Sequence, residues 1–299
     1  MKSNEKSVLC IGHINWDVII HTDRIPSPDY SSRVKNISSG VGGTATNTAK
    51  VLSSLDIDTK IVGSIGDDEF GERIESELDN LGVDSVLFKP GVETTVIHAI
   101  LPDDTDPLYF GKGDDDIGRY SPDEIPDDVW DNINHVHLTS FSEIMAEEFA
   151  QKAKDDGKTV SFNPTQGYKN TSFKTIIELS DIVILNDREL DILKSRNDFD
   201  LIIESTDIVV THGSDGCSYY DSKNKSKYTD EGEEVPKSEV VDVVGAGDAF
   251  TGALLNEWLK NTPPHQMISI ANSAGAKAVQ SVGSIDKLSK DDINFWVDL

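Results

Sequence analysis

The most informative stretch of this chain is Asp-Val-Val-Gly-Ala-Gly-Asp-Ala-Phe-Thr-Gly, residues 242–252. A helix that begins at about Asp248 is predicted by apolar residues at helical spacing: Phe250, Ala253, Leu254 and Trp258. A glycine turn that leads into a helix directs several backbone N–H groups at one point, where the helix dipole also favours negative charge. Such a turn suits a phosphate, and a carboxylate beside it can take a proton from an attacking hydroxyl. The alternative is an ordinary strand–turn–helix connection with Asp248 as its N-cap.

The length and composition of the chain allow one large domain. Its 299 residues, of which 37% are hydrophobic, suffice for an α/β domain with a core. No apolar run is long enough to span a bilayer, and the polar segment Met1–Lys6 lacks the apolar core of a signal peptide. Cys10 and Cys217 lie in expected strands, which favours buried thiols over a disulfide or a metal site. We therefore expect a cytoplasmic protein with no membrane partner.

Acidic residues dominate the charge of the chain. The 54 Asp and Glu residues against 27 Lys and Arg residues leave a net charge of −27, with a pI near 4.4. Because nucleic-acid binding needs clustered basic residues to neutralise phosphates, this balance argues against a nucleic-acid partner. The acids are spread along the sequence, and salt screens the repulsion within such a surface. These features suggest a protein from a high-salt cytoplasm.

Short apolar strands alternate with amphipathic helices along most of the chain. This alternation predicts a parallel sheet with helices on both faces and with ligands at the carboxyl ends of its strands. We expect strands at residues 8–11, 136–138, 159–162, 182–185 and 208–210, and helices at residues 45–55, 69–81 and 143–155.

Two segments, residues 14–40 and 92–116, interrupt this alternation. Both contain short runs of alternating polarity separated by Asp and Pro turns, which predicts a small antiparallel flap beside the main sheet. No internal repeat or linker divides the sequence, so we expect a single domain over residues 1–299. The acidic run Asp114–Asp116 is interpreted as a loop cap rather than a metal site.

Polar residues near the N-terminus follow the first expected strand. Asn15 and Asp17 are two positions apart and should point the same way, which suits sugar hydroxyls, although an Asx turn explains them equally well. Gly42 and Gly43 precede an expected helix that contains Asn47. Paired glycines let a ligand approach the backbone, and an Asn side chain offers both a donor and an acceptor to hydroxyls. The competing interpretation is a plain loop with Asn47 on a solvated turn.

Two later strand ends also carry candidate residues. Asn186 and Glu189 follow an expected strand, but their spacing by itself favours a structural capping box at a helix start. Thr211, Gly213 and Gly216 form another glycine turn at a strand end, which indicates little in isolation.

Several common site patterns are missing or incomplete. His135 and His137 alternate on one expected strand, yet no third ligand accompanies them, so strand packing is favoured over a metal site. The sequence has neither a Gly-x4-Gly-Lys-[Ser/Thr] loop nor a Gly-x-Gly-x2-Gly motif after the first strand. Interpretations as a Walker-type nucleotidase or a Rossmann dehydrogenase therefore lose support.

Taken in order, these segments resemble the ribokinase-like family of sugar and nucleoside kinases, the phosphofructokinase-B type. The resemblance covers nearly the whole chain, and residues 242–248 are its most specific motif. It implies an ATP-dependent kinase with an α/β, ribokinase-like three-layer sandwich: a mainly parallel central sheet and a small antiparallel β lid. The lid would be formed by about residues 14–40 and 92–116, and its free strand edges suggest a homodimer through the lid.

The resemblance also implies a role for each motif. Asp248 is the expected base, beside an anion hole formed by the N–H groups of Gly245, Ala246 and Gly247. The remaining roles are acceptor binding (Asn15, Asp17, Gly42, Gly43, Asn47), nucleotide binding (Asn186, Glu189, Thr211, Gly213, Gly216, Asn272), Mg²⁺ held through water (Glu189) and K⁺ held by backbone carbonyls (Asp242, Val244). Because Asp248 lies at a helix start, we expect its pKa to be low and its proton acceptance to be late.

Departures from the family pattern bear on the acceptor. Thr44 and Ser140 stand where ribokinases carry Lys and Glu, so two hydroxyl partners are missing and free ribose is disfavoured. His98 and the pair Tyr109–Phe110 are candidates to contact a larger or flatter acceptor, for example by stacking on a nucleoside base, although a solvent-facing position explains His98 equally well. A sugar phosphate is disfavoured because the lid offers no basic cluster.

The leading interpretation is an ATP-dependent kinase of a hydroxymethyl group on a sugar or related small polyol. A nucleoside kinase of the same fold is the alternative. Kinases of vitamin-like alcohols are a more distant rival, since they usually lack a full lid. From another class, a catalytically silent sugar-binding or regulatory protein uses the same scaffold, although Asp248 with its glycine turn argues against silence.

Overall fold

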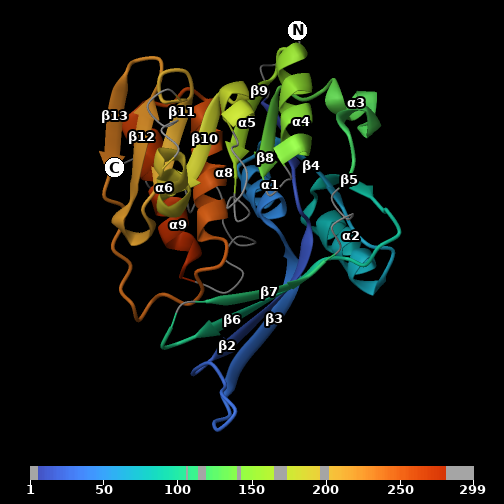
Figure 1. The fold of residues 1–299 in the computed structure, drawn as a ribbon, viewed down its shortest axis with the longest axis vertical. Helices are drawn as coiled ribbons and strands as arrows, with labels where there is room; N and C mark the ends of the chain where they lie inside the picture. Colours follow the sequence, from blue (N-terminus) through green and yellow to red (C-terminus); the bar gives the residue numbers. More distant parts are fainter. Residues whose placement is uncertain are drawn as a thin grey trace.

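The computed structural model describes residues 6–105, 107–113, 119–139, 143–164, 174–195 and 202–280. These residues form a nine-stranded main sheet with helices on both faces and a four-stranded sheet that projects from it (Figure 1). Ser140 and the run Asp114–Asp116 lie outside the described residues. Among the helices that are described, none has the length and apolar character to cross a membrane.

The main sheet is mostly parallel, as the alternation predicts. Its strand order is β13-β12-β11-β10-β9-β8-β1-β4-β5, and of these described strands only β12 runs in the direction opposite to the others. Since helices cover both faces, central strands are continuous apolar runs. The strands are β1 (Ser7–Ile11), β4 (Asp58–Ser64), β5 (Asp84–Phe88), β8 (His135–Thr139), β9 (Thr159–Asn163), β10 (Ile182–Asn186), β11 (Asp207–Thr211), β12 (Cys217–Asp221) and β13 (Ser226–Asp230).

Two helical layers complete a three-layer sandwich, and each layer has its own hydrophobic cluster against the sheet. One face carries α1 (Thr44–Ser54), α2 (Glu69–Leu81), α8 (Ala246–Leu259) and α9 (Pro264–Ala278). The other face carries α3 (Asp127–Trp130), α4 (Glu143–Asp155), α5 (Lys174–Leu179) and α6 (Asp187–Ser195). Short 3-10 helices, η1 (Pro122–Glu124) and η3 (Gly213–Asp215), lie in the connections. The strands and helices expected between residues 8 and 210 in the main sheet and its two helical layers are confirmed to within one residue at their ends.

Polar and sulfur-containing side chains inside the sheet are accommodated by packing. His135 and His137 are fully buried, and both contact the hydroxyl of Ser161, at 2.8 and 2.7 Å. Burial lowers the pKa of both imidazoles to about 3, so both are neutral at pH 7. Cys10 and Cys217 are buried free thiols. The prediction of structural histidines and thiols is confirmed.

The second sheet, called the lid below, combines the two segments that interrupt the alternation. β2 (Asn15–Thr22) and β3 (Val34–Gly42) form one antiparallel pair, and β6 (Val96–Pro102) and β7 (Leu108–Lys112) form another. β2 and β6 join the two pairs in parallel, so the lid is not purely antiparallel. β3 also continues two residues beyond the expected segment.

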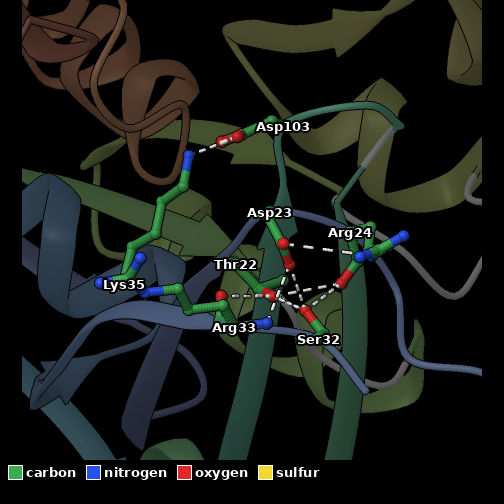
Figure 2. A network of polar contacts seen from close by, with 7 residues as sticks. All are labelled: Thr22, Asp23, Arg24, Ser32, Arg33, Lys35 and Asp103. Carbon is green, nitrogen blue, oxygen red and sulfur yellow. Dashed lines mark hydrogen bonds and ion pairs between the residues drawn. The ribbon is translucent and has the colours of Figure 1, made fainter. Parts of the chain in front are cut away.

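A polar network closes the tip of the lid (Figure 2). The carboxylate of Asp23 accepts hydrogen bonds from the Ser32 hydroxyl at 2.8 Å and from the backbone N–H of Arg33 at 2.9 Å. The Lys35 ammonium pairs with the carboxylate of Asp103, just beyond β6. These contacts hold the β2–β3 connection against the strands and tie β3 to the end of β6.

Strand register gives the lid two faces, because directly opposite residues of neighbouring strands point to the same side. We call the face nearer Asp248 the inner face. It carries Asn15, Asp17, Ile19, His21, Ser38, Ala99 and Tyr109. The outer face carries Val18, Ile20, Ile37, His98 and Phe110.

α8 packs closely against α1 at a glycine. A Cβ atom on Gly252 would lie 2.6 Å from the side chain of Val51 and 3.4 Å from the carbonyl oxygen of Thr48. Gly252 therefore sets the separation of the two helices one turn after Asp248. On α1, the residues that face Gly252 are Thr48, which follows Asn47 directly, and Val51, about one turn later.

We expect Gly252→Ala to lower the free energy of unfolding by about 1–3 kcal/mol, because the added methyl overpacks the α1–α8 contact. Urea denaturation measures this change. The double variant Gly252→Ala/Val51→Ala should recover part of the loss, since it removes Cγ1 of Val51, one of the two Val51 atoms that the new Cβ meets at 2.6 Å, while Cβ of residue 51 remains. A single variant as stable as the wild type would contradict this account of the helix contact.

Candidate active site

The first turn of α8 borders open space at Gly247, while the backbone N–H of Ala246 donates to the carbonyl of Val243 at 3.4 Å. α8 begins at Ala246, two residues earlier than expected, and its N-cap is Gly245 with a left-handed φ of 82°. Asp248 is therefore the third helical residue and not the N-cap. The N–H groups of these first residues precede the first helical hydrogen bond, from Ala249 N–H to the Gly245 carbonyl at 2.8 Å. A Cβ atom on Gly247 would meet nothing within 4 Å, so a ligand has room beside this turn.

The side chain of Asp248 is held in place from α1. Asn47 Nδ2 donates a hydrogen bond of 2.7 Å to Asp248 Oδ2, across a sequence separation of 201 residues. Gly43, the N-cap of α1, accepts the backbone N–H of Asn47 at 2.9 Å, which places Asn47 in the first turn of that helix. In the free protein, the side chain of Asn47 therefore binds Asp248.

The acidity of Asp248 differs from the prediction. Burial raises the pKa of this carboxyl to about 7, the hydrogen bond from Asn47 lowers it, and the nearby charge of Asp17 raises it. The expectation of a low pKa is wrong, because lost hydration at this position outweighs the favourable field of the helix start. A carboxylate with this pKa is well matched to accepting a proton near neutral pH.

Asp17 lies against the bare backbone of Gly42, on the other side of the site. A Cβ atom on Gly42 would lie 1.8 Å from Asp17 Oδ2, so any larger residue there would displace the carboxylate. Burial raises the pKa of Asp17 to about 6, and the charge of Lys50 lowers it. Asn15 Oδ1 and Asp17 Oδ1 are both buried without a hydrogen-bond partner. As predicted, these two side chains share one face.

Tyr109 is the aromatic residue that the lid directs toward the site. Burial raises the pKa of its phenol, as do the nearby carboxylates of Asp242, Asp17 and Asp248. His98 and Phe110 lie on the outer face and are exposed, so His98 follows the solvent-facing alternative and the expectation that Phe110 contacts an acceptor is wrong. The physical reason is that one step along a strand reverses the side to which a side chain points.

The Asn186 segment forms the capping box that its spacing predicts. Asn186 N–H donates to Glu189 Oε2 at 2.8 Å, and Glu189 N–H donates to Asn186 Oδ1 at 3.0 Å. Asn186 also lies directly opposite Thr211 across β10 and β11, so two predicted nucleotide motifs meet at the carboxyl edge of the sheet. Burial raises the pKa of Glu189 to about 7, which marks a carboxyl that a cation would stabilise in its charged form.

The glycine turn after β11 packs against the end of β13 and against α9. It spans η3, which begins at Gly213, and ends at Gly216, where a Cβ atom would lie 2.0 Å from the carbonyl oxygen of Asp230. Asn272 Nδ2 donates to Asp230 Oδ1 at 2.6 Å, so the structure brings Asn272 to the same place. One turn later on α9, a Cβ on Gly275 would lie 3.4 Å from the carbonyl of Ala246, next to the first turn of α8.

Asp242 shapes the loop that leads into α8. Its side chain is 3% exposed, and its Oδ1 accepts the backbone N–H of Val244 at 2.9 Å. Burial raises the pKa of Asp242, while that hydrogen bond and the charge of nearby His21 lower it. The backbone N–H of Asp242 donates to the carbonyl of Val279 at 3.2 Å, which ties the loop to the end of α9.

Sequence reasoning missed three residues of this region. Lys50 is buried on α1 and donates to the carbonyl of Val41 at 2.9 Å, and no sequence pattern marks it. Asn163, at the end of β9, lies 3.4 Å from the hydroxyl of Thr251 on α8. His21 lies on the inner face of the lid, and its even spacing from Asn15 and Asp17 on one strand is the signal that was available.

The raised pKa of Asp248 predicts a stability change that does not depend on any activity. An acid whose folded pKa lies above its unfolded value destabilises the fold as pH rises from the unfolded pKa through the folded pKa, here to about 7. We expect Asp248→Asn to raise the unfolding midpoint at pH 8 and to have little effect at pH 4. Thermal unfolding at both pH values measures this, with Asp67→Asn, an exposed acid, as the control. Equal or lower stability of Asp248→Asn at pH 8 would contradict it.

Comparison with known proteins gives this geometry its context. The ATP-dependent ribose-1-phosphate kinase of Halopiger xanaduensis is 32% identical to this chain over 275 residues, 90% of each protein. The nucleoside kinase of Methanothermobacter thermautotrophicus is 27% identical over 293 residues, 94% of this chain and 92% of that protein. The structure of Arabidopsis thaliana ribokinase with ribose and ATP superposes with a TM-score of 0.80 over 99% of both chains, and at 22% identity it shows the shared fold.

A sequence model of pfkB family carbohydrate kinases matches residues 5–291, nearly the whole chain. The matched residues include both sheets, the turn before α8 and the strand-end motifs described above. This chain belongs to the pfkB family of carbohydrate kinases.

Proposed function

We propose that this enzyme transfers the terminal phosphoryl group of ATP to a hydroxymethyl group of a sugar or related small polyol. The observation that carries the proposal is the Asp248 carboxylate, which has a pKa of about 7, is held by Asn47 and lies on the open first turn of α8. The names of the Halopiger and Methanothermobacter relatives support an acceptor that contains a ribosyl group.

The residues beneath the lid divide the work of the reaction. Asn15 and Asp17 hold hydroxyl groups of the acceptor, and the glycines Gly42 and Gly43 let it approach the backbone. Asp248 accepts the proton of the hydroxymethyl group as its oxygen attacks phosphorus, while the N–H groups at the start of α8 stabilise the charge on the phosphoryl group. Phosphoryl transfer depends mainly on positioning and charge neutralisation, and a positioned base adds roughly 10²- to 10⁴-fold.

The opposite side of the site suits ATP with its cations. We assign the phosphates and Mg²⁺ to Asn186 and Glu189, because a cation near the buried Glu189 would offset the burial that raises its pKa. Mg²⁺, when bound, neutralises phosphate charge. The turn from Thr211 to Gly216, together with Asn272, flanks the nucleoside of ATP. We assign K⁺ to the carbonyls of Asp242 and Val244, where the buried carboxylate of Asp242 contributes favourable negative charge.

A nucleoside is the second candidate acceptor. Tyr109 favours it, since an aromatic ring on the inner face of the lid can stack on a base. Ribose 1-phosphate belongs among the candidates too, because the Halopiger relative is named for it, although sequence analysis disfavoured sugar phosphates. A silent sugar-binding protein is disfavoured, since it has no need for a carboxylate of raised pKa beside an open anion site.

We further propose that residues 1–299 act as a single domain in a high-salt cytoplasm. ATP is available there, and reducing conditions keep the buried thiols of Cys10 and Cys217 free. The net charge of −27 supports a surface adapted to molar salt.

The outer face of the lid supports a homodimer. Ile37 and Phe110 are 60% and 55% exposed, and partly buried Val18 and Ile20 lie on the same face, which makes an apolar patch suited to a second copy. We expect wild-type protein to sediment as a dimer in analytical ultracentrifugation and Ile37→Asp to sediment as a monomer. A monomeric wild type, or a dimer that survives Ile37→Asp, would contradict this interface.

Asp248→Asn provides the direct test of the proposed reaction. We expect kcat to fall by roughly 10²- to 10⁴-fold, since the base is lost, while affinity for a non-hydrolysable ATP analogue stays within about twofold. Acceptor-dependent ADP release in molar KCl, with ribose, ribose 1-phosphate, fructose and nucleosides, measures turnover. Asp67→Asn is the matched control. Near-normal turnover in Asp248→Asn, or ligand binding without ADP release in the wild type, would refute the assignment.

A further inference from the structure

The inner face of the lid carries a line of unpaired polar atoms. Among the described residues of this face, Asn15 Oδ1, Asp17 Oδ1, His21 Nε2 and Ser38 Oγ are buried without a hydrogen-bond partner. A buried polar atom without a hydrogen-bond partner destabilises the fold, because it has lost its water and gained nothing in return. Four such atoms on one face of a small sheet indicate that a bound molecule supplies the missing hydrogen-bond partners when the lid lies closed over it.

These atoms lie at two separate levels along the lid. Asn15 and Asp17 lie at the end near Gly42 and Asp248, where the sugar binds in the proposed function. Ser38 lies opposite Ile19, and His21 lies two residue pairs further along, opposite Asn36. At a strand rise of about 3.3 Å per residue, His21 is about 13 Å along β2 from Asp17. A single sugar ring that presents its hydroxymethyl group to Asp248 does not fill both levels.

We propose that His21 and Ser38 form a second acceptor subsite, which binds a polar substituent on the sugar, on the side away from the hydroxymethyl group. This inference rests on the proposed kinase function and narrows it to substituted sugars, such as nucleosides or sugar 1-phosphates, in preference to free pentoses. The hydroxyl of Ser38 and the imidazole of His21 can each donate or accept a hydrogen bond, so they fit the edge of a base or a phosphate oxygen.

The surroundings of the subsite favour an uncharged ring over a phosphate. Ile19, Ala99 and Tyr109 lie in the same row across the sheet as Ser38, so the lining beside Ser38 is apolar and aromatic. The buried carboxylate of Asp242 lies near enough to His21 to interact with its charge, and it would repel an anion.

Two cations of the lid, Lys35 and Arg24, lie beyond the subsite, at the tip of the lid (Figure 2), and a third, Lys112 at the other end of β7, pairs with Glu93. Lys35 pairs with Asp103, and Arg24 Nε lies 4.0 Å from Asp23 Oδ2. In each pair the carboxylate neutralises the positive charge of the Lys or Arg side chain, so that charge is not available to bind a phosphate. The preference for an uncharged ring is therefore testable by comparing the two kinds of substituent.

Isothermal titration in the absence of ATP tests the subsite separately from catalysis. The ligands are uridine, adenosine, ribose 1-phosphate and ribose, and the proteins are wild type, His21→Ala and Ser38→Ala. We expect about tenfold weaker binding of the substituted sugars to each variant, the loss of one well-placed hydrogen bond, and a change within about twofold for ribose. Ser39→Ala, the next residue on the outer face, and His265→Ala, on α9, are the matched controls.

Thermal unfolding without ligand separates binding from folding. Because His21 Nε2 and Ser38 Oγ have no partner in the free protein, neither variant should lower the unfolding midpoint. Equal losses for ribose and for substituted sugars, unchanged affinities, or a lowered midpoint that accounts for the losses would overturn the proposal. Larger losses with nucleosides identify a base, and larger losses with ribose 1-phosphate identify a phosphate; either outcome supports the subsite. Selective losses in binding without any acceptor-dependent ADP release would keep the subsite and refute the kinase assignment.

Discussion

The hydrogen bond from Asn47 to Asp248 is the contact on which the rest of the site depends. It joins the first turn of α1 to the first turn of α8, and each of these helices begins after a glycine with a left-handed φ. Close packing at Gly252 keeps the two helices at the separation that this bond requires. The carboxylate is thereby fixed between the acceptor side, beneath the lid, and the open N–H groups that suit a phosphate.

Buried acids give the free protein an electrostatic cost that its ligands can relieve. Asp17, Asp242, Asp248 and Glu189 all have raised pKa values, with burial as the largest cause. A substrate hydroxyl, a phosphate with its cation or a K⁺ ion would each offset part of that burial. The unpaired polar atoms on the inner face of the lid also destabilise the free protein, and a bound acceptor would supply their missing hydrogen bonds. The acids on the surface are different, because water and salt solvate them.

Much of the architecture follows from local sequence. Continuous apolar runs such as residues 182–185 predict strands buried on both faces, and the helices between them require parallel crossovers. The faces of the lid were harder to predict. Tyr109 and Phe110 are adjacent, and only the pairing of β7 with β6 determines which of them points inward. Register is a long-range property, so residue type alone misplaced Phe110 and left the position of His98 open.

Local sequence was enough to predict a parallel sheet with helices on both faces, the two segments of the lid and the order of the motifs, because periodicity and glycine turns act over a few residues. It also named Asp248 and Asn47 as candidates. Only the tertiary structure decided that these two residues bond to each other, that Asn186 and Thr211 meet, and that His21 and Ser38 lie unpaired on one face. It also reversed the predicted acidity of Asp248, because desolvation depends on everything packed around a carboxyl and leaves no mark in its neighbouring residues.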